Sequence, residues 1–238
     1  MADARPIDTE RLDAWIADRP PAPGPPLTAE RLGTATGIAN ALYLIRRGGH
    51  AWVLRMPPAV KNDPSASDTT REWRILTALD GTPVPHPTPL LLCDDASVLG
   101  APFMVMDLVD GFTPGFELPP LFAGDATLRH GLAMAYVDGC AVLSQVDWQP
   151  RGLGGLGKPD GFLERQVPRW LAQLGRYRTR DLPELAFLTA WLEENPPVMG
   201  RPAIIHGDYS PFNVMVAREP PALGATRRGR RWRRGTQK

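Results

Sequence analysis

The sequence predicts an α+β fold in which a small β-rich region precedes a mostly helical one. Runs of strand-forming residues, with one amphipathic helix among them, precede residue 107, and helical periodicity dominates from residue 125 to 194. The chain has 238 residues, of which 43% are hydrophobic, so it is long enough to bury a sizeable core without disulfides.

The β-rich region is centred on a hairpin signal. Residues 41–45 and 51–56 are rich in strand formers, and Gly48 and Gly49 between them supply the positive φ angles of a tight turn. Two further apolar runs, 90–93 and 102–106, predict two more strands. These segments together predict a small antiparallel sheet.

Two short helices accompany the predicted strands. Residues 8–18 place apolar side chains at helical spacing, and the prolines of 20–26 that follow indicate a stiff linker. A second helix is expected over about 68–80, with a serine or aspartate cap at its start. Glu72 shares a face of this helix with Leu76 and Leu79, so its carboxylate is expected to point inward.

The helical region and the chain ends complete the organisation. Helices are expected over 125–146, 161–176 and 182–194, and a short strand over 202–205. We divide the chain into four segments. They are an N-terminal helix with a proline-rich linker (1–27), the β-rich region (28–110), the helical region (111–217) and a basic tail (218–238).

Composition and charge exclude several classes of protein. No apolar run is long enough to span a bilayer and no signal sequence opens the chain, so a soluble, cytoplasmic protein without a membrane partner is expected. Cys93 and Cys140 lie far apart without a CxxC pair, which argues against a zinc site or a disulfide framework. The formal net charge of +1 conceals a tail with eight basic residues and one acid.

One segment carries a chemical signature. His206, Asp208 and Asn213 follow the spacing H-x-D-x4-N, which is typical of the catalytic loop of kinases. Phosphoryl transfer needs a carboxylate at the attacking oxygen and an oxygen ligand for Mg²⁺, and a rigid loop between apolar flanks would hold both. The alternative is an ordinary surface turn, since Gly-Asp and Ser-Pro are common turn formers.

The segment 205–215, Ile-His-Gly-Asp-Tyr-Ser-Pro-Phe-Asn-Val-Met, resembles the signature of the aminoglycoside phosphotransferase and choline kinase-like enzymes. The branch fused to acyl-CoA dehydrogenases is more similar, through the segments 51–58, 71–76, 84–87 and 99–106. The resemblance covers roughly residues 30–217 and implies a protein-kinase-like fold of two lobes, with an antiparallel sheet and one helix in the nucleotide-binding N-lobe and an incomplete helical C-lobe. It also implies an ATP-dependent phosphotransferase acting on a hydroxyl of a small molecule.

The resemblance assigns roles to five residues. Asp208 would be the catalytic base, Asn213 a Mg²⁺ ligand, and His206 a brace for the loop. Arg55 occupies the position of the kinase phosphate-binding lysine, and Glu72 would pair with it. The alternative for these two is a surface cation and a solvated acid.

Four further residues would contact the nucleotide. Gly37 and Asn40 lie where the family has its phosphate-covering turn, although an ordinary turn fits the same residues. Met106 and Leu108 would lie in the inter-lobe hinge, whose backbone would bond adenine. Methionine at these apolar positions is also typical of a core.

The tail departs from the family pattern. A second acidic metal ligand, at the end of an apolar strand, is expected after Asn213, yet no acid follows Glu219. We expect a truncated or frameshifted C-lobe, with the shift between about 217 and 225, impaired activity, and self-association through exposed apolar surface. The alternatives are a non-catalytic nucleotide-binding remnant and, less expected, nucleic-acid binding through the arginine-rich tail.

Overall fold

The computed structural model describes residues 7–19, 24–33, 40–57 and 68–218, which form two compact units. The first unit joins Met1–Val146 to Ile205–Lys238, and the second is Asp147–Ile204. No helix in the described ranges has the length and apolar character needed to cross a bilayer.

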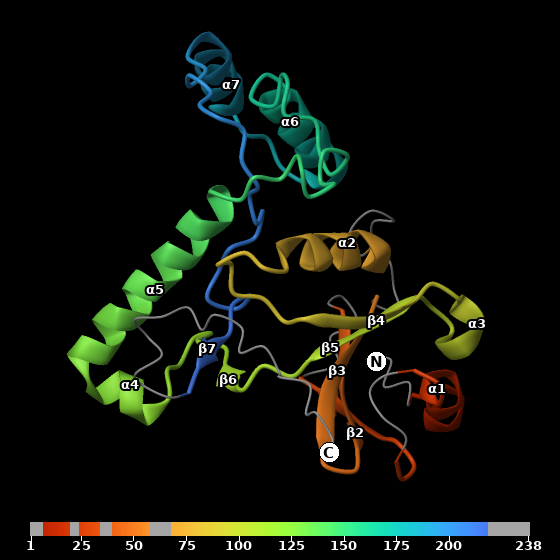
Figure 1. Ribbon diagram of the computed structural model, residues 1–238. Helices are drawn as coiled ribbons and strands as arrows, with labels where there is room; N and C mark the ends of the chain where they lie inside the picture. The colour runs from red at the N-terminus through yellow and green to blue at the C-terminus, as the bar shows by residue number, and fades with distance from the viewer. Residues whose placement is uncertain (1–6, 20–23, 34–39, 58–67, 219–238) are drawn as a thin grey trace. The chain divides into compact units, whose positions relative to one another are not determined.

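The first unit contains α1 (Thr9–Ile16), β1 (Thr28–Leu32), β2 (Ala41–Arg47), β3 (His50–Met56), α2 (Thr69–Leu79), β4 (Pro89–Cys93), α3 (Ala96–Leu99), β5 (Phe103–Asp107), β6 (Gly111–Phe112), α4 (Pro120–Gly124), α5 (Ala126–Ser144) and β7 (Val216–Ala217) (Figure 1).

An antiparallel sheet of five strands, in the order β1-β2-β3-β5-β4, forms the centre of the first unit. The predicted hairpin is confirmed as β2 and β3, and Gly48 has a φ of 57° at its turn. Both other predicted strands are present as β4 and β5. The edge strand β1, with the polar sequence TAERL, was not predicted, because it lacks the apolar alternation of a half-buried strand.

Helix α1 covers one face of the sheet. Its Leu12 and Ile16 are 0% and 2% exposed and belong to the same core cluster as Ile45 and Leu54. Arg47, at the end of β2 and only 5% exposed, forms an ion pair with Asp13 of this helix. The segment predicted to form an N-terminal helix therefore packs directly against the sheet.

Helix α2 packs against the opposite face. Asp68 caps it by accepting a 3.0 Å hydrogen bond from the backbone N–H of Arg71. Trp73 and Leu76 of this helix contact the second cluster of the sheet, formed by Val53, Met104 and Met106. Alternate residues of β3 thus point to different helices, so Arg55, two residues after Val53, points to the α2 side.

A second, short ladder connects the region after β5 to the motif region. Strand β6 pairs with β7 in antiparallel register, with Gly111 opposite Ala217 and Phe112 opposite Val216. Asp110 and Arg218 extend this ladder by an exposed ion pair of 3.6 Å. Strand β6 was not predicted, because such a short pairing leaves no periodic pattern. The apolar run 214–216 was expected as a short strand beside the motif loop, and its last residue begins β7.

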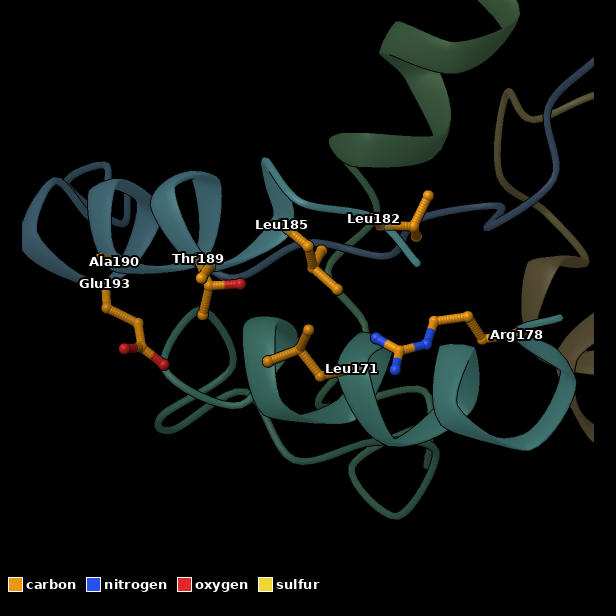
Figure 2. A pocket seen from close by; sticks show the side chains of 8 residues that line it. Leu171, Arg178, Leu182, Leu185, Thr189, Ala190 and Glu193 are labelled. Atoms are coloured by element: carbon orange, nitrogen blue, oxygen red, sulfur yellow. The ribbon is translucent and has the colours of Figure 1, made fainter. Parts of the chain in front are cut away.

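The second unit contains helices α6 (Gln166–Tyr177) and α7 (Leu185–Glu194). They bound a groove of about 480 Å³. Figure 2 shows its apolar floor, with the Arg178 guanidinium and the Glu193 carboxylate at opposite ends. The groove is lined by Leu171, Arg178, Leu182, Leu185, Ala186, Thr189, Ala190 and Glu193.

Three predictions about the helical region needed correction. Residues 161–165 form turns rather than the first turn of a helix, and α7 begins at Leu185 rather than 182, after Pro183. The strand predicted over 202–205 is wrong, since these residues form no ladder. Apolar character alone suggested that strand, but a strand requires a partner for its backbone hydrogen bonds.

Candidate active site

The motif residues lie in the loop that precedes β7. The Asn213 side chain donates through Nδ2 to the Asp208 carboxylate Oδ2 at 2.7 Å and to the Asp208 backbone oxygen at 3.0 Å. The backbone N–H of Asn213 donates to the carbonyl of Ser210 at 2.9 Å, which closes the turn between them. The predicted five-residue spacing therefore brings the carboxylate and the amide into direct contact.

His206 lies beside the same carboxylate-bearing residue. Its Nδ1 accepts a long 3.4 Å hydrogen bond from the backbone N–H of Asp208, which requires this nitrogen to be unprotonated. Its ring meets the edge of the Tyr209 ring at a centroid distance of 5.4 Å. All three motif side chains, His206, Asp208 and Asn213, are exposed to solvent.

The loop is attached to the β6 region by close backbone approaches. A Cβ on Gly111 would lie 2.6 Å from the carbonyl oxygen of Val216, so only glycine fits at that position of the ladder. Farther along, the backbone N–H of Gly115 donates to the carbonyl of Pro211 at 3.2 Å. Phe116 and Phe212 add an edge contact between rings, with centroids 4.6 Å apart.

The apolar flanks of the motif are not buried as the sequence suggested. Ile205 is 67% exposed and Met215 is 52% exposed. Burial therefore does not hold the loop at these positions. The hydrogen bonds and ring contacts described above are the interactions that define its shape.

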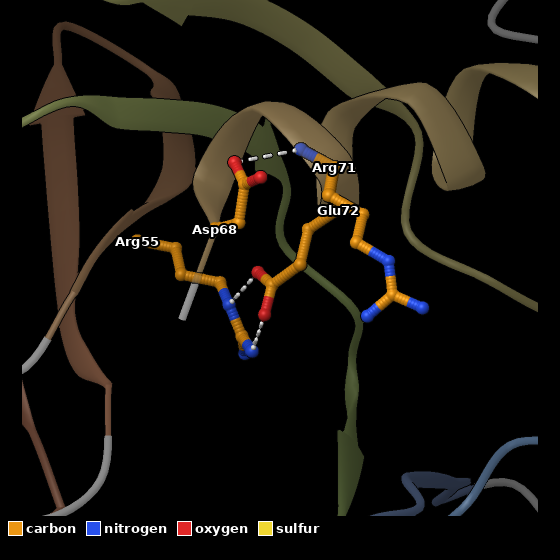
Figure 3. A network of polar contacts seen from close by, with 4 residues as sticks. All are labelled: Arg55, Asp68, Arg71 and Glu72. Atoms are coloured by element: carbon orange, nitrogen blue, oxygen red, sulfur yellow. Dashed lines mark hydrogen bonds and ion pairs between the residues drawn. The ribbon is translucent and has the colours of Figure 1, made fainter. Parts of the chain in front are cut away.

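Arg55 and Glu72 form the predicted pair (Figure 3). The guanidinium donates through Nε to one carboxylate oxygen at 2.6 Å and through Nη2 to the other at 2.8 Å. Both side chains are about one third exposed, at 29% and 30%. The two-pronged geometry fixes the orientation of both planar groups, and it uses two of the five N–H groups of the guanidinium.

The other predicted nucleotide contacts are placed only in part. Asn40 is half-buried immediately before β2, whereas Gly37 lies outside the described residues. Met106 is 9% exposed and belongs to the core cluster under α2, as its alternative interpretation held. Leu108 is 42% exposed and follows β5 in the segment that leads to β6.

The oxygen donors of the loop fit a magnesium ion only if it arrives with a nucleotide. Within the described ranges no group of three or more His, Cys, Asp or Glu side chains is arranged to hold a metal. Asn213 uses its amide nitrogen for both bonds to Asp208, so its amide oxygen is the donor that the resemblance assigns to the ion. Mg²⁺ is commonly held by one or two oxygen-bearing side chains together with waters and substrate phosphates, so this amide oxygen suits a nucleotide-bound ion.

Comparison with known proteins identifies a family. Residues 33–225 match the model of the phosphotransferase enzyme family. The chain resembles acyl-CoA dehydrogenase family member 11 of Gallus gallus, with 34% identity over 183 residues, covering 76% of this chain and 23% of the relative. It is also similar to acyl-CoA dehydrogenase family member 10 of Mus musculus, with 32% identity over 179 residues, covering 75% of this chain and 17% of the relative.

A solved structure agrees with these sequence matches. A Ralstonia eutropha protein assigned to the aminoglycoside phosphotransferases superposes with a TM-score of 0.72 and 31% identity, covering 90% of this chain and 62% of that protein. The chain thus spans about a quarter or less of the two curated relatives named above and under two thirds of the solved one. The predicted α+β, protein-kinase-like fold is confirmed.

Proposed function

The chain belongs to the phosphotransferase enzyme family and descends from small-molecule kinases; we propose that it transfers the γ-phosphoryl group of ATP to a hydroxyl group of a small molecule. The observation that carries this proposal is the contact between Asn213 and Asp208, because it fixes the orientation of a carboxylate in the loop. A fixed carboxylate is what a hydroxyl nucleophile requires.

The proposed reaction uses Asp208 as the base. The acceptor oxygen forms a bond to the γ-phosphorus, the bond from that phosphorus to the bridging oxygen breaks, and ADP leaves with the bonding electrons. The acceptor's proton passes to the Asp208 carboxylate. Because Asn213 bonds Oδ2, the other oxygen, Oδ1, is the proton acceptor in this proposal. His206 braces the loop through its contact with the backbone N–H of Asp208.

The Arg55–Glu72 pair serves the phosphates of the nucleotide in this proposal. Arg55 carries a permanent positive charge, and Glu72 orients its guanidinium from helix α2. Magnesium, when bound, would neutralise charge on the transferring phosphoryl group. Asn213 is the residue that would hold it, while Asn40, Gly37, Met106 and Leu108 remain the proposed contacts of the nucleotide itself.

We propose that turnover by this chain is low and that it binds free Mg²⁺ weakly. Within the described residues no group of three or more His, Cys, Asp or Glu side chains is arranged to hold a metal beside Asn213. We place the protein in the cytoplasm, a proposal supported by Cys93 and Cys140, which are both free thiols.

The test is a coupled assay of phosphoryl transfer with ATP, Mg²⁺ and a panel of hydroxylated small molecules. Asp208→Asn should lower kcat by about 10² to 10⁴-fold, because the carboxylate contributes as a general base. Asp181→Asn is the matched control, since this exposed acid lies in the second unit. Robust turnover that survives Asp208→Asn would refute the assignment, whereas ATP binding without turnover would favour the non-catalytic remnant.

Helix α7 supports the proposal of self-association. One of its faces lines the groove against α6, and the other carries four large apolar residues that are 41–72% exposed. A helix that is apolar on both sides is normally buried on both sides. The exposed residues are Phe187, Leu188, Trp191 and Leu192.

A further inference from the structure

Two tyrosines outside the predicted site join the motif loop to helix α5. The Tyr136 hydroxyl donates to the backbone carbonyl of Tyr209 at 2.6 Å. In return, the Tyr209 hydroxyl donates to the backbone carbonyl of Tyr136 at 2.7 Å. The two rings stack with centroids 4.4 Å apart and an interplanar angle of 28°. We call this reciprocal contact the tyrosine clasp.

The clasp holds the residue next to the proposed base. Tyr209 directly follows Asp208, so the carbonyl that Tyr136 bonds lies only one residue beyond the residue bearing the carboxylate. The same Tyr209 ring receives the edge of the His206 ring. Tyr136 of α5 therefore restrains the backbone that follows Asp208. Through the Tyr209 ring it also restrains the His206 ring, which precedes Asp208.

Gly139 makes room for the clasp. It lies one helical turn after Tyr136, in the interior of α5, where glycine costs about 1 kcal/mol of helix stability relative to alanine. A Cβ at this position would lie 2.6 Å from the Tyr209 hydroxyl oxygen, well inside contact distance. An alanine would therefore displace that hydroxyl from its bond to the Tyr136 carbonyl.

We propose that Tyr136 and Gly139 are positioning residues, which hold the Asp208 loop in its reactive arrangement through Tyr209. The inference rests on the proposed function for the role of Asp208. Neither residue reaches the reacting atoms in this proposal. Their contribution is to limit the number of loop conformations in which Asp208 and Asn213 face an acceptor.

The test compares two clasp variants with two matched controls. Tyr136→Phe removes only the hydroxyl that bonds the loop. Gly139→Ala removes the space for the Tyr209 hydroxyl and also favours the helix, an effect that a glycine-to-alanine control in another helix reproduces. Tyr177→Phe, at a tyrosine that is 61% exposed, and Gly175→Ala, where a Cβ meets nothing within 4 Å, make the same chemical changes in α6. Amide hydrogen exchange over 206–213 and steady-state kinetics are measured for all four on the full chain.

Both clasp variants should speed exchange in the loop about fivefold, the effect of losing one hydrogen bond. They should lower kcat by about ten- to hundredfold with KM changed less than about twofold, since a misplaced base affects the chemical step. The controls should change neither quantity. A purely structural role would lower the fraction of folded protein and leave kcat per folded molecule unchanged.

The outcomes separate this inference from the proposed function. Unchanged loop exchange in both clasp variants would overturn the positioning role, whatever the activity. Faster loop exchange with kcat per folded molecule preserved would also overturn it. If the unmodified chain shows no turnover, faster exchange confined to the two clasp variants still supports restraint of the loop, while the proposed function fails in its own assay.

Discussion

The ion pair between β3 and α2 offers a prediction whose magnitude follows from the structure. Arg55 and Glu72 share two hydrogen bonds of 2.6 and 2.8 Å, and about 30% of each side chain is exposed. A fully exposed pair would contribute at most about 1 kcal/mol, and hydrogen bonds to charged groups contribute about 1.5–3 kcal/mol when shielded. Partial solvent screening places the expected coupling free energy between these limits, at about 1–2 kcal/mol.

A double-mutant cycle measures this coupling. Arg55→Met, Glu72→Gln and the double variant are unfolded with urea, and the coupling is the non-additive part of the unfolding free energies. Each single variant should lower Tm by about 2–4 °C per kcal/mol lost. The fold should persist, because Trp73 and Leu76 still pack α2 against the sheet. Nucleotide affinity should fall in the Arg55 variant more than in the Glu72 variant, since only Arg55 carries charge for the phosphates.

The control cycle uses the pair Arg178–Asp181, whose atoms are 4.0 Å apart and whose side chains are 45% and 101% exposed. Its coupling should stay below about 0.5 kcal/mol. The reasoning is refuted if the Arg55–Glu72 coupling is no larger than this control. The nucleotide role is refuted separately if the Arg55 variant binds Mg²⁺-ATP as tightly as the unmodified chain.

Three further predictions concern the rest of the molecule. Gly111→Ala should lower the free energy of unfolding in urea by about 1–3 kcal/mol, because the new Cβ overlaps the Val216 carbonyl. Gly124→Ala, where a Cβ meets nothing within 4 Å, should not. Equal stabilities of the two variants would contradict the close approach of Gly111 to Val216. Burial raises the pKa of the Tyr209 phenol above its usual 10.0, so the unfolded state loses this proton first and stability should fall as pH rises above about 10. Tyr209→Phe should reduce this loss of stability at high pH. A stability profile that is the same with and without the Tyr209 phenol would contradict its raised pKa. Trp191→Glu should lower the apparent mass in light scattering towards the monomer. A monomeric mass of the unmodified chain at every concentration tested would rule out self-association.

Local signals in the sequence predicted most of the first unit. Aspartates at positions 68 and 125 cap α2 and α5 as their residue types favour. Of the two glycines after β2, Gly48 takes the positive φ of the hairpin turn and Gly49 does not. These features act over a few residues, so they are visible without tertiary information. Strands β1 and β6 were missed because their pairing partners, and not their own periodicity, make them strands.

The site shows the same division between local and distant signals. The spacing of Asp208 and Asn213 predicted a contact that the structure contains, because both residues lie in one turn. Tyr136 and Tyr209 are 73 positions apart, and no spacing rule joins them. Gly139, one of two glycines inside the predicted helix, was a hint, since such a glycine often has a packing reason.

The exposure of the motif loop changes how its order must be explained. Ile205 and Met215 are more than half exposed, so hydrophobic burial supplies little of the free energy that holds the loop closed. The remaining restraints are hydrogen bonds, each contributing on the order of 1 kcal/mol, and three ring contacts. Losing one of a few weak restraints raises the population of open loop severalfold, whereas losing one contact of a packed core does not open the core. In this loop, therefore, the interactions that stabilise it locally are the same ones that orient Asp208, and a variant that weakens them should affect catalysis before it affects the global fold.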